Sequence, residues 1–514
     1  MKVSWKNDWP AALLVLAAAI LIVPLWTVRS PGMPDYPAHI AGFFLVAHPT
    51  PYYSVHWVLV PNLASEMAVP VLAKLFALET ATKLFLSLAV AMWVLGPGAI
   101  QRALTGRIGV TSLAGALFAY NANFTWGFFN YYFSAGLCFV IFAAWIVAAK
   151  RRGPLTLATF AAAVVVLYAC HLFAVCILVT LIACFEASRA LDERLTDLKT
   201  LARRAAESAA VFVPAAIVYV AVHPAGGAGD LEFNYADTIG DRLASAIQVN
   251  FSDPAYLMIG GLAILVLAGL IYRRIRVHRL AKILVLVLAT LTVAAPEWAM
   301  GGWGVDLRLP AVLEAVLFAG MEVRLGARFM KGLAALLLAA AAANAAQLAD
   351  AWRGYDRQYG EFRDAIRSLP RGVRLLTVLD GDALGDTADP PYWHMAEFAI
   401  VDKGAFTPLM FATKGQHIVR VNPPYDRWAA ASAQQGSPPD VTELTDLSIG
   451  RDDEDTDIKD VFPYLKHFQC HYDVAVVISG NSEESTVPPF MELRHSGSFF
   501  SLYDIHPTHA CVRR

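Results

Sequence analysis

One acid and one histidine stand four residues apart, just after the first long apolar run of the chain. Residues 30–44 read SPGMPDYPAHIAGFF, with Asp35 between two prolines and His39 after them. Proline fixes the backbone angle φ and stiffens the segment, so the carboxylate of Asp35 can be held in one place. A positioned carboxylate can take a proton from a hydroxyl as a general base, or bind a divalent cation.

If this segment is helical, His39 shares a helical face with Asp35 and either orients its carboxylate or shares a metal ion with it. A loop acid beside an unrelated surface histidine would have the same sequence. The spacing alone leaves both interpretations open, and the position of the pair relative to a membrane bears on the choice.

The composition is that of a membrane protein. Of the 514 residues, 57% are hydrophobic and 16% are charged, whereas soluble domains carry about 25% charged residues. The formal net charge of -2 gives no basic field of the kind that attracts nucleic acid. The sequence contains no P-loop and no strand-anchored G-x-G-x-x-G motif, so nothing in it indicates a nucleotide site.

The apolar runs predict about eleven transmembrane helices, because a span needs roughly 20 apolar residues and shorter runs are tolerated inside a bundle. No small-residue cleavage site follows the first run, which is therefore expected to be a retained span and not a signal peptide. The segment 307–322 is short and carries Glu314, so it could be re-entrant. The predicted spans are 10–28, 80–100, 108–122, 129–149, 154–169, 171–188, 207–223, 254–272, 279–296, 307–322 and 328–348.

Lysine and arginine residues gather in one set of the predicted loops. Because cationic loops stay in the cytoplasm, the N-terminus is expected to be cytoplasmic and everything beyond residue 348 extracytoplasmic. After the N-terminal pair, each basic cluster follows an even-numbered span, which supports the count. The basic set is Lys2, Lys6, Arg102, Arg107, residues 150–152, the arginines within 189–204, the arginines within 273–279, Arg324, Arg328 and Lys331.

Residues 1–348 are therefore predicted to form a transmembrane domain, and residues 349–514 a periplasmic soluble α/β domain. The polar part begins with a helix over 350–370, and β-type runs follow it. Cys470 and Cys511 could form a disulfide if this part is exported, but sequence gives no distance between them. The β-type runs are RLLTVL from Arg374, EFAIV from Glu397, HIVRV from His417, YDVAVVISG from Tyr472 and FFSLYDI from Phe499.

Further candidate substrate-binding residues are predicted on the outer face. His171 falls at a turn between two predicted spans, where an ionisable group either serves a site or caps the turn. Arg308 carries a guanidinium that suits a lipid phosphate, and Asp306 is a further candidate substrate-binding residue, although the two could instead form a surface pair. Asn123 lies in AYNANFTWGFFNYYF, whose amides and aromatic rings could bind a sugar or form an interfacial belt.

The whole arrangement resembles the GT-C superfamily of membrane glycosyltransferases, and most closely bacterial enzymes of the family-39 type, which use polyprenyl-phosphate sugars. The resemblance rests on the long first span, the D-x-P-x-H stretch at 35–39, an expected interfacial helix within 66–79, many further spans and a soluble tail. It implies that Asp35 is the catalytic base toward the acceptor hydroxyl, or a metal ligand. Many relatives carry a second acidic motif between the third and fourth spans. This chain has none there, which weakens a metal-dependent mechanism.

These features predict an inverting glycosyltransferase, a hexosyl or pentosyl transferase, in the bacterial inner membrane. It would move a sugar from a polyprenyl-phosphate donor to a glycan, lipid or protein acceptor outside the cytoplasm. In this hypothesis Asp35 is the base, His39 positions it, and Arg308 steadies the phosphate. A divalent cation, Mg²⁺ or Mn²⁺, remains open as a cofactor, as do the sugar, the acceptor and the oligomeric state.

Two other interpretations stay open. A transporter or flippase of lipid-linked glycans would need charged residues along its spans, and these are scarce apart from Glu314. A non-catalytic envelope scaffold would bind partners through its exported part and would tolerate Asp35→Asn, which a transferase would not.

Overall fold

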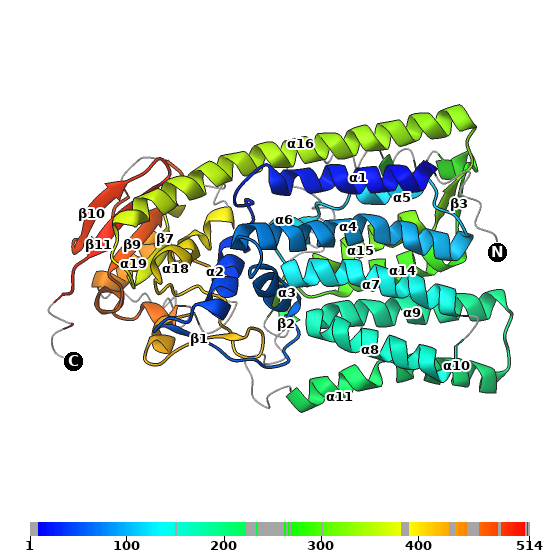
Figure 1. Ribbon diagram of the computed structural model, residues 1–514, viewed down its shortest axis with the longest axis horizontal. Coiled ribbons are helices and arrows are strands. Elements are labelled where there is room, and N and C mark those ends of the chain that lie inside the picture. The colour runs from blue at the N-terminus through cyan, green and yellow to red at the C-terminus, as the bar shows by residue number, and fades with distance from the viewer. Residues whose placement is uncertain are drawn as a thin grey trace.

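The computed structural model has a long bundle of helices at one end and the main β-sheet at the other (Figure 1). It describes residues 9–149, 152–222, 233–234, 262–263, 266–267, 269–299, 302–381, 390–430, 437–449, 462–481, 485–508 and 511. The helices of the bundle are α1 (Trp9–Trp26), α4 (Leu78–Thr105), α7 (Phe129–Ala148), α8 (Pro154–Cys170), α9 (Leu172–Asp192), α10 (Leu198–Ala210), α11 (Val213–Val222), α14 (Arg279–Ala294), α15 (Arg308–Ala319) and α16 (Ala327–Ala365).

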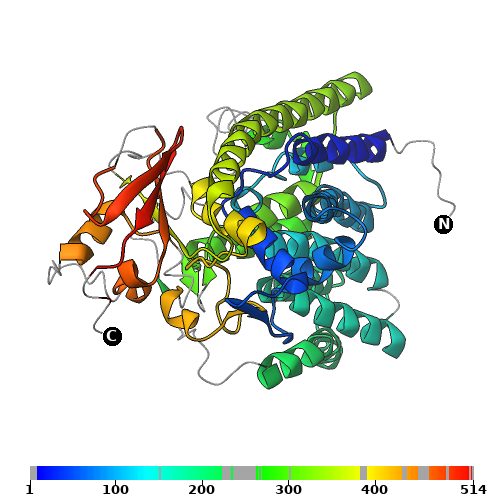
Figure 2. The ribbon, with the colours of Figure 1, turned by 60° about the vertical axis from the view of Figure 1, so that its left-hand side comes forward.

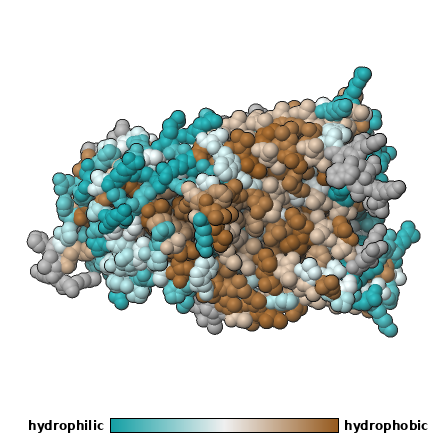
Figure 3. Space-filling view, viewed as in Figure 1, coloured by the Kyte–Doolittle hydropathy of each residue, from teal (hydrophilic) through white to brown (hydrophobic). Residues whose placement is uncertain are grey.

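Five of the described helices, α1, α4, α7, α9 and α16, are long and apolar enough to cross a membrane. The bent pair of α10 and α11 makes a sixth if the two form one span. Figure 3 shows a broad hydrophobic band over this bundle, with hydrophilic surface at both ends of the molecule. The protein is a mostly helical, multi-pass membrane protein.

The predicted count of eleven spans is not confirmed. The run 108–122 is not one helix, because it divides into α5 (Thr111–Ala116), a turn and the start of α6 (Ala122–Trp126). The run 307–322 contains α15, which has 12 residues and is too short to span alone. All residues of α5 are buried. An apolar run looks the same in the sequence whether its residues pack inside the protein or face lipid, so it was predicted as a span. Most of the predicted span 254–272 lies outside the described residues.

The end of the bundle away from the main sheet is the basic end. Arg107 forms an ion pair with Glu322 at 3.2 Å, and Arg279 forms one with Asp192 at 2.7 Å. A short antiparallel pair of strands, β3 (Ile275–Val277) and β6 (Met321–Val323), lies at the same end. Loops that are far apart in the sequence therefore meet at this end of the bundle, as the distribution of basic residues led us to expect. The side of the membrane on which this end lies stays a prediction.

The main sheet has four strands in the order β10, β11, β9 and β7. Strand β7 (Leu375–Leu379) runs parallel to β9 (Val474–Ile478), while β11 (Phe500–Ile505) pairs antiparallel with β9 and with β10 (Met491–Ser496). All five residues of β9 are buried, as expected for a central strand. The helices α18 (Phe398–Lys403) and α19 (Val441–Ile449) belong to the same part of the chain.

A disulfide joins Cys470 to Cys511, the pairing that the sequence left open. The helix predicted over 350–370 is the last part of α16 and the short turn that follows it. Because α16 runs without a break through residue 349, the domain boundary drawn there stays a prediction.

Four of the five β-type runs contain strands, but EFAIV from Glu397 does not. Its residues form the turn η5 (Met395–Glu397) and the helix α18, which ends before Gly404 in the left-handed conformation. Phe398, Ala399 and Ile400 are all fully buried, and a short buried helix has the same continuous apolar run as a buried strand. Strand β10 was not predicted because most of its side chains are exposed and polar.

The first outer loop lies between the bundle and the main sheet (Figure 2). Its helix α2 (Tyr36–Ala47) contributes Ala41 and Leu45 to the apolar core beneath the sheet. Its strand β1 (Tyr53–Val55) pairs antiparallel with β8 (Val419–Val421). A second helix, α3 (Ala64–Leu72), covers part of the predicted interfacial segment 66–79 and exposes Met67 and Val71. The loop is thus fixed by both parts of the chain.

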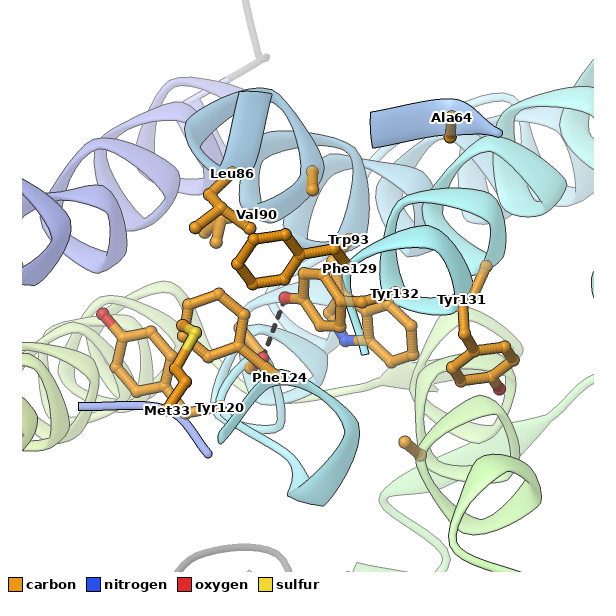
Figure 4. Close-up of a cluster of buried hydrophobic side chains, with 14 of the residues drawn as sticks. Met33, Ala64, Leu86, Val90, Trp93, Tyr120, Phe124, Phe129, Tyr131 and Tyr132 are labelled. Carbon is orange, nitrogen blue, oxygen red and sulfur yellow. Dashed lines mark hydrogen bonds between the residues drawn. The ribbon is translucent and has the colours of Figure 1, made fainter. Parts of the chain in front are cut away.

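An aromatic cluster in the bundle fixes the start of α7, from which Phe129, Asn130 and Tyr131 line the cavity described below. Figure 4 shows the rings of Trp93, Phe124 and Tyr132 packed together. Trp93 stacks on Tyr132 with ring centroids 4.8 Å apart, and the hydroxyl of Tyr132 donates to the backbone oxygen of Ala119 at 2.8 Å. Large rings lose little conformational entropy when they are buried, so such a cluster gives a rigid base for the site.

Gly32 determines how closely the first outer loop approaches α16. A Cβ atom at this position would lie 2.4 Å from Cδ2 and 2.8 Å from Cβ of Tyr355. We expect Gly32→Ala to lower the free energy of unfolding by about 1–3 kcal/mol, because the loop must move away from the helix. Gly354→Ala on the same helix is the control, since nothing lies within 4 Å of its added carbon. Thermal unfolding checks this, and equal melting temperatures for the two variants would contradict the close approach.

Candidate functional site

A cavity of about 500 Å³ lies where the first outer loop, the bundle and the C-terminal part meet. This volume is within the range of small-molecule sites, roughly 300–1,000 Å³. Four residues that the sequence singled out line it: Asp35, His39, His171 and Arg308. Asp306 and Asn123 do not. The other charged, polar or aromatic lining residues are Asn62, Glu66, Trp126, Phe128, Phe129, Asn130, Tyr131, Glu297, Trp298, Trp303, Trp393, His394, Phe411, Thr413, Gln416, His417 and Ser437.

Asp35 immediately precedes α2 and is fixed by the loop between α6 and α7. Its backbone N–H donates to the backbone oxygen of Trp126 at 3.0 Å. The next residue of that loop, Gly127, has φ +94°, and a Cβ there would lie 3.1 Å from Cβ of Asp35. Glycine is needed at this point for both the conformation and the space. The side chain of Asp35 does not cap its own helix and is available to the cavity.

The carboxylate of Asp35 is largely shielded from water, with 16% of the side chain exposed. Burial raises the pKa of Asp35 to about 6, and the neighbouring His394 opposes this rise. Atom Nε2 of His394 lies 4.0 Å from Oδ1 of Asp35. No donor in the described part of the chain forms a hydrogen bond with the carboxylate. Above pH 6 or so it is thus an anion able to accept a proton from a bound hydroxyl.

His39 lines the cavity, but the expected contact of its imidazole with Asp35 is not found. Among the described residues there is no hydrogen bond or ion pair between the two side chains. The imidazole stacks on Phe129 with centroids 4.4 Å apart, and Phe411 meets it edge-on at 5.4 Å. Burial, with a smaller contribution from His417, lowers the pKa of His39 to about 3. His39 lies on a helix, α2, as the sequence analysis considered, but its imidazole packs against aromatic rings and not against the acid.

The imidazole beside Asp35 belongs to His394, which the sequence analysis did not single out. It is 4% exposed, and its Nδ1 lies 3.8 Å from Oε1 of Glu397. Burial by itself would lower the pKa of His394, but Glu397 and Asp35 together raise it above the usual value. The signal in the sequence was the H-x-x-E spacing in WHMAEF, which only a helical reading of this segment would have shown.

Arg308 begins α15 and, among the described residues, has no ion pair within 4 Å. One of its Nη atoms donates to the backbone oxygen of Trp303 at 3.0 Å, and the rings of Phe128 and Tyr131 each lie 5.5 Å from its guanidinium carbon. Its Nε has no hydrogen-bond partner in the described part of the chain, and no carboxylate there lies within 4 Å of it. The expected alternative, a surface pair with Asp306, is not found as an ion pair within 4 Å, but Asp306 is buried and its charge still acts on the guanidinium. The unpartnered Nε–H suits a phosphate oxygen.

His171 and Asn123 have structural partners. Nδ1 of His171 accepts a hydrogen bond from the backbone N–H of Phe173 at 3.1 Å and so caps α9, while its ring lines the cavity. The capping alternative is therefore found, and the substrate-binding role of His171 stays a prediction. Asn123 is fully buried and donates to the backbone oxygen of Leu307 at 2.9 Å. It holds the chain just before Arg308 and does not reach the cavity.

A second carboxylate, Glu66 on α3, also lines the cavity. Its Oε2 accepts hydrogen bonds from Nδ2 of Asn130 at 2.8 Å and from the hydroxyl of Ser65 at 2.9 Å. Burial raises the pKa of Glu66 to about 7, against the lowering effect of these hydrogen bonds. The sequence analysis placed this residue in an interfacial helix and assigned it no chemistry, because nothing local indicates the contact with Asn130.

Three tryptophans from distant segments form one wall of the cavity. The ring of Trp126 lies 4.4 Å from that of Trp303 and 5.7 Å from that of Trp393. Nε1 of Trp303 donates to Oε1 of Glu297 at 2.7 Å, which fixes its plane. Flat apolar faces with fixed orientation suit the C–H faces of a sugar ring.

Among the described residues, no group of three or more His, Cys, Asp or Glu side chains lies close enough to hold a metal ion. Near Asp35, His394 already faces Glu397, and His39 is stacked on Phe129. Mg²⁺ and Mn²⁺ prefer several oxygen ligands around one point. These side chains do not fit such a site, and the steps derived below use none.

No family model and no curated protein matches the sequence. Among solved structures, the chain is similar to ArnT from Cupriavidus metallidurans bound to undecaprenyl phosphate, with a TM-score of 0.48 and 13% sequence identity. The similarity covers 97% of this chain and 98% of that chain. A likeness of this degree gives no residue a role, so the chemistry of the cavity has to follow from its own geometry.

The raised pKa values of Asp35 and Glu66 predict how a hydrophobic carbodiimide, which attacks protonated carboxyl groups, labels them. The protonated fraction falls as the pH rises, so labelling of Asp35 should decline through about pH 6 and that of Glu66 through about pH 7. Peptide mass spectrometry after labelling between about pH 5 and pH 8 measures both. Asp350, 86% exposed, controls for the chemistry of the reagent. If neither cavity carboxyl reacts faster than Asp350 at any pH, the described burial is wrong.

Proposed function

We propose that the protein is a glycosyltransferase that moves a sugar from a polyprenyl-phosphate donor to an acceptor hydroxyl in the cavity beside Asp35. One observation carries the proposal: in the described part of the chain, the same cavity holds a shielded carboxylate without a hydrogen-bond donor and an arginine, Arg308, that has no carboxylate within 4 Å and whose Nε has no hydrogen-bond partner. A general base and an anion-binding group are the two elements that this displacement needs.

The proposed reaction is a direct displacement. Asp35 takes the proton of the acceptor hydroxyl as its oxygen forms a bond to the anomeric carbon of the sugar. The bond from that carbon to the phosphate oxygen breaks, and the phosphate leaves with the electron pair. Arg308 donates hydrogen bonds to the phosphate as its charge grows. Because attack and departure occur on opposite faces, the configuration at the anomeric carbon inverts.

The tryptophan wall formed by Trp126, Trp303 and Trp393 supports a carbohydrate as the group that moves. Its rings line the same cavity as the base, Asp35, and the arginine, Arg308. Stacking holds a sugar by its face and leaves its edges free for polar contacts. The identity of the sugar and of the acceptor stays open.

We place the basic end of the bundle in the cytoplasm and the cavity on the outer side of the bacterial inner membrane. Loops rich in lysine and arginine remain in the cytoplasm. The disulfide between Cys470 and Cys511 supports an oxidising compartment for the other end. A lipid-linked donor could then reach the cavity from the outer leaflet, so that no soluble nucleotide sugar is needed.

The position of the cavity favours an enzyme over a flippase. It lies at the end of the bundle between the first outer loop and the C-terminal part, whereas a transport path has to continue through the membrane. An envelope scaffold would have no need for a shielded acid and a buried arginine in one cavity. The variant below separates a scaffold from an enzyme.

Asp35→Asn should reduce turnover by at least about 100-fold, because an amide cannot take the acceptor proton. Turnover is measured as release of polyprenyl phosphate in lipid nanodiscs, with a panel of polyprenyl-phosphate hexoses and pentoses as donors and a total membrane lipid extract as acceptor. For the unaltered protein, the rate should fall as the pH drops through about 6, since protonated Asp35 is not a base. Asp350→Asn, on the exposed face of α16, is the control. An Asp35→Asn variant with normal turnover would refute the proposal.

A further inference from the structure

Glu397 is a carboxylate with no exposed surface, and the reaction above does not use it. In the described part of the chain its Oε1 accepts one long hydrogen bond, from the hydroxyl of Thr407 at 3.4 Å, and its Oε2 accepts none. Burying an ionised carboxylate costs several kcal/mol unless a cation compensates it. Its place in the molecule therefore needs an explanation.

The only cationic group within ion-pair distance of Glu397, among the described residues, is His394. The two residues are three apart on one helical turn, with Nδ1 of His394 at 3.8 Å from Oε1 of Glu397, an ion-pair contact longer than a hydrogen bond. The other ring nitrogen, Nε2, faces Oδ1 of Asp35 at 4.0 Å. One imidazole thus lies between two carboxylates that are far apart in the sequence.

Aromatic packing holds this imidazole in place. Phe411 meets the ring of His394 edge-on, with centroids 4.8 Å apart and planes at 71°. Phe411 is itself stacked on His417 at 5.3 Å. With 4% of His394 exposed, the ring has little room to turn away from Asp35.

Glu397 is also tied to the first outer loop, which carries Asp35. Its partner Thr407 donates its backbone N–H to the hydroxyl of Tyr53 at 3.0 Å and accepts from that hydroxyl at 2.9 Å. Tyr53 therefore links the segment that carries His394 and Glu397 to the loop that carries Asp35.

We infer that Glu397 and His394 are a positioning pair for the base: the charge of Glu397 attracts the Nδ1 side of the His394 imidazole, so that Nε2–H faces the carboxylate of Asp35 and keeps it anionic and directed into the cavity. The inference rests on the proposed function, because it acts through Asp35. Neither His394 nor Glu397 touches the reacting hydroxyl. A buried pair that only stabilised the start of α18 would not require the second nitrogen to face Asp35.

The inference predicts the direction in which the pH dependence of the rate will change. Loss of the charge of Glu397 lowers the pKa of His394, and a neutral His394 no longer opposes the effect of burial on Asp35. The pKa of Asp35 then rises above about 6, and the acid limb of the rate profile moves to higher pH. The other titratable groups nearby are His39 and His417 on the cavity side, and Tyr53 and Tyr464 around Glu397. The substitution leaves all four in place.

The test is Glu397→Gln in the full-length protein, with the nanodisc assay described above. We expect kcat to fall roughly tenfold, the KM for the donor to stay the same, and the acid limb to move up by about one pH unit. The double variant Glu397→Gln with His394→Gln should be no slower than His394→Gln alone, because the two residues act in series. Glu361→Gln is the matched control, since its carboxylate binds Ser498 on the surface.

A second variant keeps the test decisive if Glu397→Gln does not fold. Glu397→Asp keeps the negative charge, so it should keep the acid limb of the unaltered protein even if its kcat falls. An unchanged pH profile in Glu397→Gln, an effect confined to KM, multiplicative losses in the double variant, or a shifted limb in Glu397→Asp would each overturn the inference. The proposed function fails separately, if the unaltered protein shows no turnover or Asp35→Asn remains active.

Discussion

The exclusion of water from one carboxylate, that of Asp35, is the constraint on which the rest of the site depends. An acid in water is a weak base, whereas a shielded acid with a pKa near 6 is still ionised at neutral pH and gains more from taking a proton. Shielding requires three separate segments to meet: the loop at Gly127, the start of α2, and the turn that carries His394. Each segment is anchored by contacts of its own. The cost of burial is offset by the imidazole, and not by a lysine or arginine that would hold the acid in a permanent ion pair.

The bundle, the C-terminal part and the first outer loop each make a different contribution to the site. The bundle gives an apolar surface for the membrane and, through Trp93 and Tyr132, a rigid start for α7. The C-terminal part closes the cavity with His394 and Phe411. The first outer loop, which carries Asp35, is anchored on the C-terminal part through β1 and Tyr53. This arrangement explains why the site residues lie at the junction and not within the bundle, where a charged substrate would be costly to bind.

Much of the fold could be predicted from the sequence, because apolar runs and basic loops report directly on helices and on their ends. The number of spans could not be predicted. Helices α5 and α15 are apolar because they pack against protein, and each is too short to cross a bilayer.

At the site, Asp35 and Arg308 could be picked out by their unusual place beside predicted spans. His394 and Glu397 were missed because a buried helical turn was read as a strand, and Glu66 because its partner Asn130 is 64 residues away. His39 was expected to contact Asp35, but its ring stacks on Phe129, since spacing along a helix does not say which way a ring will turn.

The most direct test of the central claim is an electron cryo-microscopy map of the protein in nanodiscs with undecaprenyl phosphate. The claim predicts density for the phosphate in the cavity, within hydrogen-bond distance of the guanidinium of Arg308 and one sugar ring away from Asp35. Phosphate density at the basic end of the bundle, beside Arg107 or Arg279, with none near Arg308, would contradict it.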